Sequence, residues 1–130
     1  MQYAIFLLSG KEGGNILYTV CQTVGGYLAD IHDAKENAYI YNQIKILGIG
    51  DWWLGGIDIE VEGDWMWVNS RAMLDESYTN WRAGEPNSMF NNENCLQMES
   101  TGLWNDINCI QHMHYICKKG PQVNGQTIIG

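Results

Sequence analysis

The sequence predicts a single α+β domain from its length and from the order of its helical and strand-like patterns. A chain of 130 residues is long enough to bury a core. No repeat, low-complexity tract or Pro/Gly/Ser linker divides it. Two helical patterns fall in the first half, and short strand-like segments separated by turn residues follow Gly50. We therefore expect residues 1–130 to fold as one domain.

The first predicted elements are a strand and a helix. The apolar run "QYAIFLL" (2–8) predicts an opening strand. The segment "NILYTVCQTVGG" (15–26) predicts a helix. It should end at Gly25 and Gly26, because glycine readily adopts the left-handed conformation that commonly closes a helix.

A second helix is predicted over 33–48. Asp33 and Glu36 have the spacing of a capping box, and Gly48 should end the helix. The face of this helix that packs on the core should carry Ile40, Ile44 and Leu47.

Four short segments in the second half predict strands, because they are aromatic or alternating and lie between turn residues. They are "WWLGG" (52–56), "DWMWV" (64–68), "NCLQME" (94–99) and "MHYICKK" (113–119). Between 68 and 94 the chain has no regular period, although Leu74, Tyr78 and Trp81 need apolar surroundings. A segment this long without regular structure predicts a functional loop.

The charge balance limits the classes of partner. Seven Lys and Arg stand against fifteen Asp and Glu, which gives a net charge of −8. No basic run gathers that could bind nucleic acid or an anionic membrane, so cations are the favoured partners. The start "MQYAIFLLSG" lacks the basic region of a signal peptide, and no stretch reaches the roughly 20 apolar residues of a spanning helix. We expect a mature, soluble protein without membrane insertion.

The four cysteines, Cys21, Cys95, Cys109 and Cys117, do not have the spacing of a zinc site. An even number favours two disulfides and therefore an oxidising compartment outside the cytosol. Three pairings are open from the count alone. The alternative is reduced cysteines buried in a cytosolic core.

Five residues at the end of the long loop and shortly after it offer only oxygen ligands. They are Glu85, Asn87, Glu93, Asn105 and Asp106. Three of them are carboxylates, and this set of donor atoms favours a hard cation such as Ca²⁺ over zinc or copper. The alternative is that these residues are simply solvated.

Several motifs occur together in the order of one protein family. "GGYLADI", "WWLGG", "NW" followed by "EPN", "NENC", "WND" and "YIC" resemble the motifs of C-type lectin-like carbohydrate-recognition domains in their short form. The resemblance covers about 3–118 and implies two helices flanking small antiparallel sheets, with a long loop that carries a Ca²⁺ site. It leaves 119–130 as a C-terminal tail, in which Asn124 and Gly125 favour a tight hairpin turn. Whether this tail forms a strand, contacts another subunit or is disordered stays open.

The resemblance also implies the disulfide pairing and the local geometry of the site. The implied pairs are Cys21 with Cys117 and Cys95 with Cys109. The second pair would fold the chain so that Asn105 and Asp106 come near Glu93. The peptide between Glu85 and Pro86 would be cis, an arrangement found in only about a twentieth of X-Pro bonds.

By the same resemblance, the five oxygen-bearing residues would bind one Ca²⁺ and a sugar together. In similar domains two neighbouring sugar hydroxyls complete the Ca²⁺ shell, and each can bond to a carboxylate and an amide. The order Glu85, Pro86, Asn87 accompanies sugars with equatorial 3- and 4-hydroxyls: mannose, N-acetylglucosamine and fucose. Met89 and Phe90 would lie beside the sugar ring or, alternatively, belong to the loop's own core.

A second, auxiliary Ca²⁺ site would use Asp58, Glu62, Glu93 and Asn94. Ser88 stands where relatives commonly carry Asn or Asp, and Asn94 replaces a frequent Asp, so two of the expected ligands are weakened. The alternative is that Asp58 and Glu62 are polar residues of a turn.

The sequence thus predicts a secreted, Ca²⁺-dependent lectin without catalytic activity, whose partners are glycans with terminal mannose-class sugars. Because one exposed sugar binds weakly, we expect a homo-oligomer that presents several sites together. The alternative is a domain of the same fold that binds a protein or an ice surface. His32, His112 and His114 have no nucleophile context and are expected to be structural.

Overall fold

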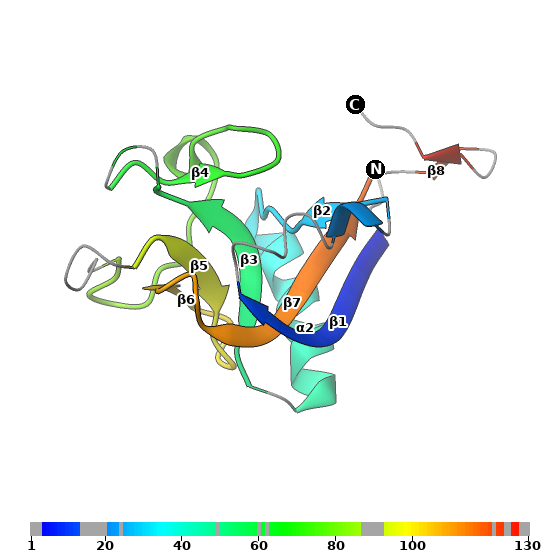
Figure 1. Cartoon of the computed structure of the whole chain (residues 1–130), viewed down its shortest axis with the longest axis horizontal. Coiled ribbons are helices and arrows are strands. Elements are labelled where there is room, and N and C mark those ends of the chain that lie inside the picture. Colours follow the sequence, from blue (N-terminus) through cyan, green and yellow to red (C-terminus); the bar gives the residue numbers. More distant parts are fainter. Residues whose placement is uncertain are drawn as a thin grey trace.

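The computed structural model describes residues 4–13, 21–23, 25–48, 50–59, 61, 63–86, 93–120, 122–123 and 126–127. Its elements in chain order are β1 (Ala4–Gly13), β2 (Tyr27–Leu28), α2 (Ala34–Leu47), β3 (Trp52–Ile57), β4 (Met66–Trp67), the 3-10 helix η1 (Leu74–Glu76), β5 (Cys95–Met98), β6 (Trp104–Ile107), β7 (His112–Lys119), β8 (Gln122–Val123) and β9 (Gln126–Thr127). In Figure 1, α2 lies behind the strands β3 and β7. The fold is the predicted α+β type.

One mixed sheet runs through the domain in the order β1-β7-β3-β5-β6, with β2 paired to β7 and β4 paired to β3. Strands β3 and β7 are parallel, and the other pairs in this sheet are antiparallel. The parallel pair joins the smaller antiparallel groups into one sheet. Strand β1 pairs with β7 from Ala4 opposite Lys119 to Gly13 opposite His112, so segments near both ends of the domain meet.

The opening strand is confirmed but is longer than predicted. Its pairing with β7 shifts register between Leu8 and Glu12 and then continues to Gly13. Residues 9–13 are polar and glycine-rich and carry no strand pattern of their own. They are extended because β7 offers them a pairing partner.

Helix α2 confirms the second predicted helix and both of its ends. Asp33 Oδ1 accepts a hydrogen bond from the Glu36 N–H at 2.8 Å. Glu36 Oε1 in turn accepts one from the His32 N–H at 2.9 Å, one residue earlier than in a standard capping box. Gly48 closes the helix in the left-handed conformation, with φ of 65°.

The buried face of α2 differs from the prediction at one position. Ile40 and Ile44 are buried, but Leu47 is 47% exposed, because the helix ends at this residue. Asn37 is buried in its place. Its amide donates to a backbone carbonyl at 3.3 Å, and its oxygen accepts from Trp104 Nε1 at 2.9 Å. A polar residue is tolerated there because both of its polar groups are hydrogen-bonded.

The structure describes the first predicted helix only at its end, where residues 21–23 are helical. Gly25 has φ of 80°. Gly25 donates its N–H to Gln22 O, and Gly26 donates to Cys21 O, each at 3.0 Å. These are the two bonds of a Schellman motif, so the two glycines end the helix as predicted. The segment 15–20 lies outside the described residues.

Aromatic side chains form the centre of the core. Trp53, Trp67 and Trp104 are fully buried. The long irregular segment after β4 is anchored to this core as predicted, because Leu74 is fully buried and Tyr78 and Trp81 pack against the same cluster partly exposed. The irregular segment is therefore held by side-chain packing rather than by regular secondary structure.

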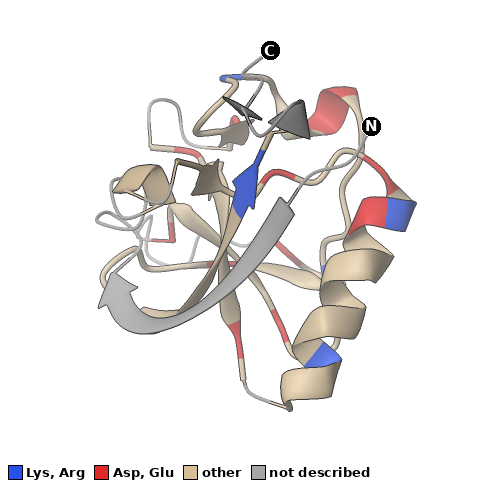
Figure 2. Cartoon of the chain, turned by 90° about the vertical axis from the view of Figure 1, so that its right-hand side faces the viewer, with Lys and Arg blue, Asp and Glu red and all other residues tan. Residues whose placement is uncertain are grey.

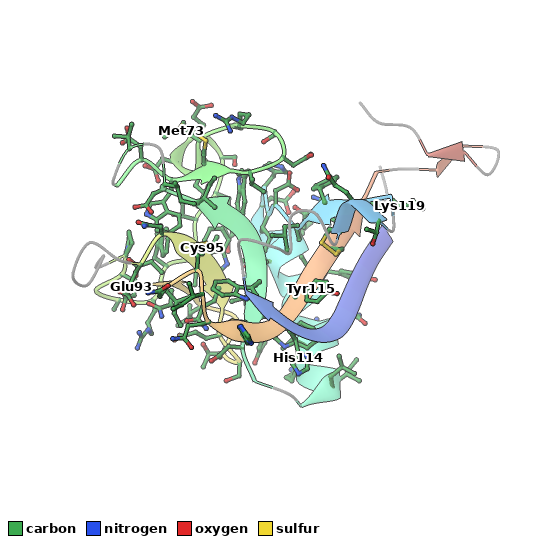
Figure 3. The ribbon with its side chains drawn as sticks, viewed as in Figure 1. Met73, Glu93, Cys95, His114, Tyr115 and Lys119 are labelled. Carbon is green, nitrogen blue, oxygen red and sulfur yellow. A yellow bond between two sulfur atoms is a disulfide. The ribbon has the colours of Figure 1, made fainter. Side chains whose placement is uncertain are left out.

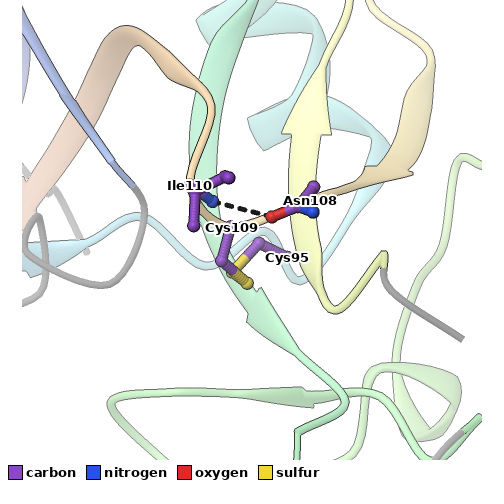
Figure 4. Close-up of a disulfide and its surroundings, with 4 residues drawn as sticks. All are labelled: Cys95, Asn108, Cys109 and Ile110. Atoms are coloured by element: carbon purple, nitrogen blue, oxygen red, sulfur yellow. Dashed lines mark hydrogen bonds between the residues drawn. A yellow bond between two sulfur atoms is a disulfide. The ribbon is translucent and has the colours of Figure 1, made fainter.

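Both predicted disulfides are present, Cys21–Cys117 and Cys95–Cys109. The first joins residues 96 positions apart and the second joins residues 14 apart. In the chain-entropy model, loops of these lengths correspond to stabilisations approaching 5 and about 3 kcal/mol. Figure 4 shows the shorter link beside a turn in which the Ile110 N–H donates to Asn108 Oδ1 at 3.0 Å.

A buried ion cluster connects α2 with β7. Basic residues are few among the acidic ones (Figure 2), and one of them, Lys118, is only 1% exposed. Its Nζ lies 2.7 Å from Asp30 Oδ1 and also contacts the Glu36 carboxylate. His32 Nε2 lies 3.1 Å from Asp30 Oδ2. The buried ammonium is thus paired with two carboxylates.

The cluster shifts two pKa values in opposite directions. Burial acts to raise the pKa of Asp30, but the hydrogen bond from His32 and the charge of Lys118 outweigh it and hold this pKa below its ordinary value. The hydrogen bond to Asp30 raises the pKa of His32 above its ordinary value, although burial opposes it.

We expect the contribution of this cluster to the free energy of unfolding to be largest between about pH 4 and 6.5, the ordinary pKa values of Asp and His. The contribution of Asp30 is present above about pH 4 and is lost as pH falls through its lowered folded pKa. The contribution of His32 is complete below about pH 6.5 and is lost as pH rises through its raised folded pKa. Because His32 is 42% exposed, the loss should stay below about 1 kcal/mol.

Urea unfolding between pH 5.5 and 9 checks the histidine part of this prediction. The wild-type midpoint should fall with rising pH, and the fall should be absent in His32→Gln. The matched control is His112→Gln, because His112 is exposed and its loss should leave the fall unchanged. An equal fall in wild type and His32→Gln would contradict the prediction.

The tail contains a hairpin, as the "NG" pair predicts. Strands β8 and β9 are antiparallel with Val123 opposite Gln126. Asn124 and Gly125 themselves lie outside the described residues. In Figure 1 this hairpin projects away from the large sheet. Within the described ranges, no helix is both long enough and apolar enough to cross a bilayer.

Candidate functional site

Two segments of the chain build the candidate site: the loop of residues 80–86 and the hairpin of β5 and β6. The Trp104 N–H donates to Asn80 O at 2.9 Å, and the Arg82 N–H donates to Trp104 O at 2.8 Å. These two bonds hold the loop against the start of β6. The loop that carries Glu85 is thereby joined to β6 at Trp104, the residue before the Asn and Asp of the "WND" motif.

The hairpin brings further predicted ligands to the same part of the molecule. Antiparallel pairing sets Gln97 opposite Asn105 and Leu96 opposite Asp106. Glu93 lies two residues before β5, at the end of the hairpin shown in Figure 3. The sequence does not predict β6, so the expected proximity of Asn105 and Asp106 to Glu93 depended on the disulfide alone. In the structure the strand pairing supplies it, and the disulfide closes the end of the hairpin.

Glu85 is held in place from several directions. The peptide between Glu85 and Pro86 is cis, as predicted. The Glu85 N–H donates to Arg82 O at 2.9 Å, across a turn in which Gly84 has φ of 88°. The side chain is 7% exposed, and its Oε2 lies 3.0 Å from Arg82 Nη2. The carboxylate therefore has a defined position within the loop.

Asn105 is oriented by a residue that the sequence analysis did not select. Its Nδ2 donates to Gln97 Oε1 at 2.8 Å, and Gln97 is 3% exposed. The sequence feature that could have indicated this role is a glutamine inside the apolar strand "NCLQME", because a buried amide requires a polar partner. Holding Asn105 through one of its two N–H groups leaves the other donor of that amide available for a further bond.

Part of the predicted set lies outside the described residues. Asn87 of the principal site falls there, as do the candidate sugar contacts Met89 and Phe90 and the candidate auxiliary ligand Glu62. The structure therefore describes Glu85, Glu93, Asn105 and Asp106 of the principal set.

The auxiliary site is described at three of its four residues: Asp58, Glu93 and Asn94. Asp58 and Asn94 are neighbours, because the Asp58 N–H donates to Asn94 O at 3.2 Å. The Asp58 side chain is 2% exposed, and its Oδ2 accepts from the Gly63 N–H at 3.0 Å. The bond to Gly63 is the one expected for a polar residue of a turn, whereas the bond between Asp58 and Asn94 is made by main-chain atoms alone.

The chemistry of the site suits a hard cation. Asp106 is fully buried and the Glu85 side chain is nearly so, and both offer the carboxylate oxygens that a hard cation prefers. With Glu93 the site carries three negative charges, of which Arg82 offsets one. Within the described ranges, no three His, Cys, Asp or Glu side chains form a group that could hold a metal ion, and this includes Glu85, Glu93 and Asp106.

The contacts of His32 and His114 are with residues outside the predicted ligand set. His32 belongs to the buried ion cluster. The ring of His114 packs on Trp52, with centroids 5.0 Å apart, and His112 is exposed.

The family of the chain follows from comparison with known proteins. A model of the family described as "Lectin C-type domain" matches residues 16–119, and the chain belongs to this family. It is 42% identical over 102 residues to a perlucin-like protein of Mytilus galloprovincialis. The match covers 75% of this chain and 64% of that protein, so the chain spans a little less than two thirds of this relative's length.

Solved structures agree on the fold. The carbohydrate-recognition domain of the mouse scavenger receptor C-type lectin has a TM-score of 0.85 at 25% sequence identity, over 95% of this chain and 92% of that one. A calcium-independent type II antifreeze protein has a TM-score of 0.80 at 27% identity, over 92% of this chain and 87% of that one. The fold thus includes both a lectin domain and an antifreeze protein among its near relatives.

Proposed function

We propose that this chain is a secreted, non-catalytic carbohydrate-recognition domain that binds sugars through a bound Ca²⁺. The observation that supports this most directly is the pair of backbone hydrogen bonds at Trp104, which joins the loop of Glu85 to the strand of Asn105 and Asp106. These bonds join the two chain segments that carry the proposed ligands, which lie some 20 positions apart in the sequence.

In this proposal one Ca²⁺ is held by Glu85, Asn87, Glu93, Asn105 and Asp106. Six protein oxygens are available if Asp106 also offers its main-chain carbonyl, and Ca²⁺ takes about six to eight. Two neighbouring hydroxyls of a sugar complete the shell. Each hydroxyl donates to a carboxylate and accepts from an amide N–H, which uses its full hydrogen-bonding capacity. Apolar contact with the ring would come from Met89 or Phe90.

The sugars proposed are mannose, N-acetylglucosamine and fucose, whose equatorial 3- and 4-hydroxyls suit the order Glu85, Pro86, Asn87. A glycan array probed in the presence of Ca²⁺ tests this. Glycans with these sugars at their ends should retain the protein, and galactose-terminated glycans should not. An array blank across all mannose-class sugars would refute the proposal.

Exchanging the acid and the amide of the motif should change the sugar preference. We expect Glu85→Gln combined with Asn87→Asp to favour galactose over mannose, because the swap exchanges the positions of donors and acceptors around the ion. Competitive elution with the two free sugars measures the preference. The matched control is Glu76→Gln with Asn69→Asp, the same two changes at exposed positions earlier in the chain. A sugar profile unchanged from wild type would contradict the specificity argument.

A second, weaker Ca²⁺ site is proposed at Asp58, Glu62, Glu93 and Asn94, supported by the backbone bond between Asp58 and Asn94. Calcium titration should give two ions per chain for wild type and one for Asp58→Asn, which keeps an acceptor oxygen for Gly63. A stoichiometry of one in wild type would remove this site.

We further propose that the chain acts as a single domain, with a core of about 3–118 and a tail of 119–130, and that it assembles into a homo-oligomer. A single sugar held by a few hydrogen bonds binds weakly, and several linked sites raise the overall affinity by effective concentration. Light scattering should give a mass above that of one chain. A measured mass equal to that of one chain would contradict the proposed oligomer.

A second candidate function is binding of a protein or an ice surface by the same fold. It is supported by the similarity to an antifreeze protein described as calcium-independent. The two candidates differ in their response to Ca²⁺. Inhibition of ice recrystallisation that persists in excess EDTA, together with a blank glycan array, would favour the second candidate.

A further inference from the structure

Arg82 bridges two carboxylates at the edge of the candidate site. Its Nη2 lies 3.0 Å from Glu85 Oε2, and its Nε lies 3.3 Å from Glu99 Oε1. Glu85 is one of the proposed calcium ligands, whereas Glu99 comes directly after β5 and is not. The guanidinium thus ties a ligand to a residue outside the ligand set.

The backbone of Arg82 makes the same connection. Its N–H donates to Trp104 O at 2.8 Å, and its carbonyl accepts from the Glu85 N–H at 2.9 Å. Arg82 therefore contacts the strand that carries Asn105 on one side and the turn that carries Glu85 on the other.

Exposure distinguishes this pair from an ordinary surface salt bridge. Surface pairs contribute little, since both side chains are solvated and must be ordered to meet. Here the Glu85 side chain is 7% exposed, the Glu99 side chain 21% and the Arg82 side chain 46%. The carboxylate is desolvated and its partner is anchored at a second point. The planar guanidinium fork, unlike an ammonium, can engage both carboxylates through separate N–H groups.

We propose that Arg82 is a positioning residue for the calcium ligand Glu85. This rests on the proposed function. Arg82 engages Oε2 and keeps the carboxylate in one orientation before an ion arrives, so that binding does not have to order this side chain. Glu99 keeps the guanidinium itself in place.

The positive charge of Arg82 has an effect of the opposite sign, because it repels the incoming cation. The repulsion and the orientation of Glu85 can be distinguished by their different dependence on salt concentration. Repulsion involving a half-exposed group is largely screened at 1 M salt, where the Debye length is about 3 Å. The orientation of Glu85 within the protein depends far less on screening. If an Arg82 variant binds calcium more weakly than wild type at 1 M salt, the difference therefore measures the loss of the orientation of Glu85.

The test is calorimetric titration of Ca²⁺ at 0.15 M and 1 M salt for wild type, Arg82→Ala and Arg82→Lys. At 1 M salt we expect Arg82→Ala to bind Ca²⁺ about three- to tenfold more weakly, and Arg82→Lys to recover part of this loss because an ammonium can still contact one carboxylate. Lys35→Ala removes one positive charge from an exposed position of α2 and should behave as wild type. Calcium binding by Arg82→Ala that is unchanged or tighter at 1 M salt would overturn the proposal.

A double-mutant cycle gives a readout that a purely structural role would not move. Glutamine at position 85 has no charge for the guanidinium to hold, so in a Glu85→Gln background Arg82→Ala should cause no further loss of Ca²⁺ affinity. In the absence of Ca²⁺, the NMR signal of the Glu85 carboxyl carbon should differ between wild type and Arg82→Ala. It should be the same in wild type and Lys35→Ala. An equal loss of affinity in both backgrounds would overturn the proposal. If wild type binds no Ca²⁺ at all, the proposed function fails; if wild type binds and the Arg82 variants match it, only this inference fails.

Discussion

Excess EDTA is expected to release the protein completely from mannose resin. In the proposed site the sugar hydroxyls are ligands of the ion, so removal of Ca²⁺ removes the main attachment of the sugar and leaves carboxylates that repel one another. Calcium bound at the proposed site would also stabilise the folded state, by about 2.7 kcal/mol at a hundredfold excess over the dissociation constant. Chelation should therefore lower the melting temperature as well. Retention that survives chelation would exclude this mode of binding.

The corresponding variant is Asp106→Asn, which keeps the shape of the side chain and removes one charge. We expect calcium affinity to fall at least about tenfold, equivalent to about 1.4 kcal/mol, because Ca²⁺ sites are tuned by the number of their charged ligands. Retention on mannose resin at limiting Ca²⁺ should be lost and should return at higher Ca²⁺. The fall in calcium affinity is measured by titration.

The control for Asp106→Asn is Asp75→Asn, the same chemical change at an exposed residue of η1. It lowers the net negative charge of the protein equally but should leave calcium affinity and sugar retention unchanged. If the two variants weakened binding to the same extent, the effect would come from overall charge, and the assignment of Asp106 as a ligand would fail.

Trp104→Ala is expected to cause the largest loss of stability among single changes, about 3–5 kcal/mol in the free energy of unfolding. Trp104 is fully buried, and its ring lies 5.7 Å from Trp67, 5.8 Å from Tyr78 and 6.1 Å from Trp81, all edge-on. Truncation would leave a cavity between these rings. It would also leave Asn37 Oδ1 without its donor, a further cost for a buried acceptor.

Urea unfolding with the disulfides intact measures this loss. Trp104→Phe should lose less than Trp104→Ala, because it keeps a ring in the cluster and gives up only the indole N–H and part of the volume. Ile110→Ala is the control, since Ile110 is 68% exposed and should change stability by no more than about 0.5 kcal/mol. A loss for Trp104→Ala as small as that of Ile110→Ala would contradict the packing described above.

Trp104 also links stability to the site. It precedes Asn105 and Asp106 in β6, and its backbone holds the loop of Glu85 through Asn80 and Arg82. We therefore expect the fraction of Trp104→Ala that remains folded to bind Ca²⁺ more weakly than wild type. Calcium titration well below the melting temperature of the variant checks this.

The elements that local patterns predicted are those whose ends carry local signals. Helix α2 begins at Asp33 and ends before Gly48 as predicted, because a capping side chain and a left-handed glycine act on residues within one turn. The pairing of β8 with β9 agrees with the same kind of local signal, the "NG" pair between them.

The elements that local patterns missed depend on distant partners. Strand β6 is only four residues long and contains Asn105 and Asp106, which have low strand propensity. It is a strand because β5 pairs with it. The second half of β1 is likewise extended by β7. Leu47 fits the apolar period of α2, but the helix ends there and leaves the side chain exposed.

For the candidate site, the sequence by itself determined which ligand atoms are available, namely the oxygens of five side chains in two motifs. It also determined that four cysteines can form two disulfides. Only the tertiary structure decided how the two motifs meet, through the bonds at Trp104 and the pairing of β5 with β6, and which side chains contact the proposed ligands. Arg82 contacts Glu85 and Gln97 contacts Asn105, and no sequence motif indicates either partner. The physical reason is that donor chemistry is a property of single residues, whereas the orientation of a buried polar group is set by whichever partner the fold brings within hydrogen-bonding distance.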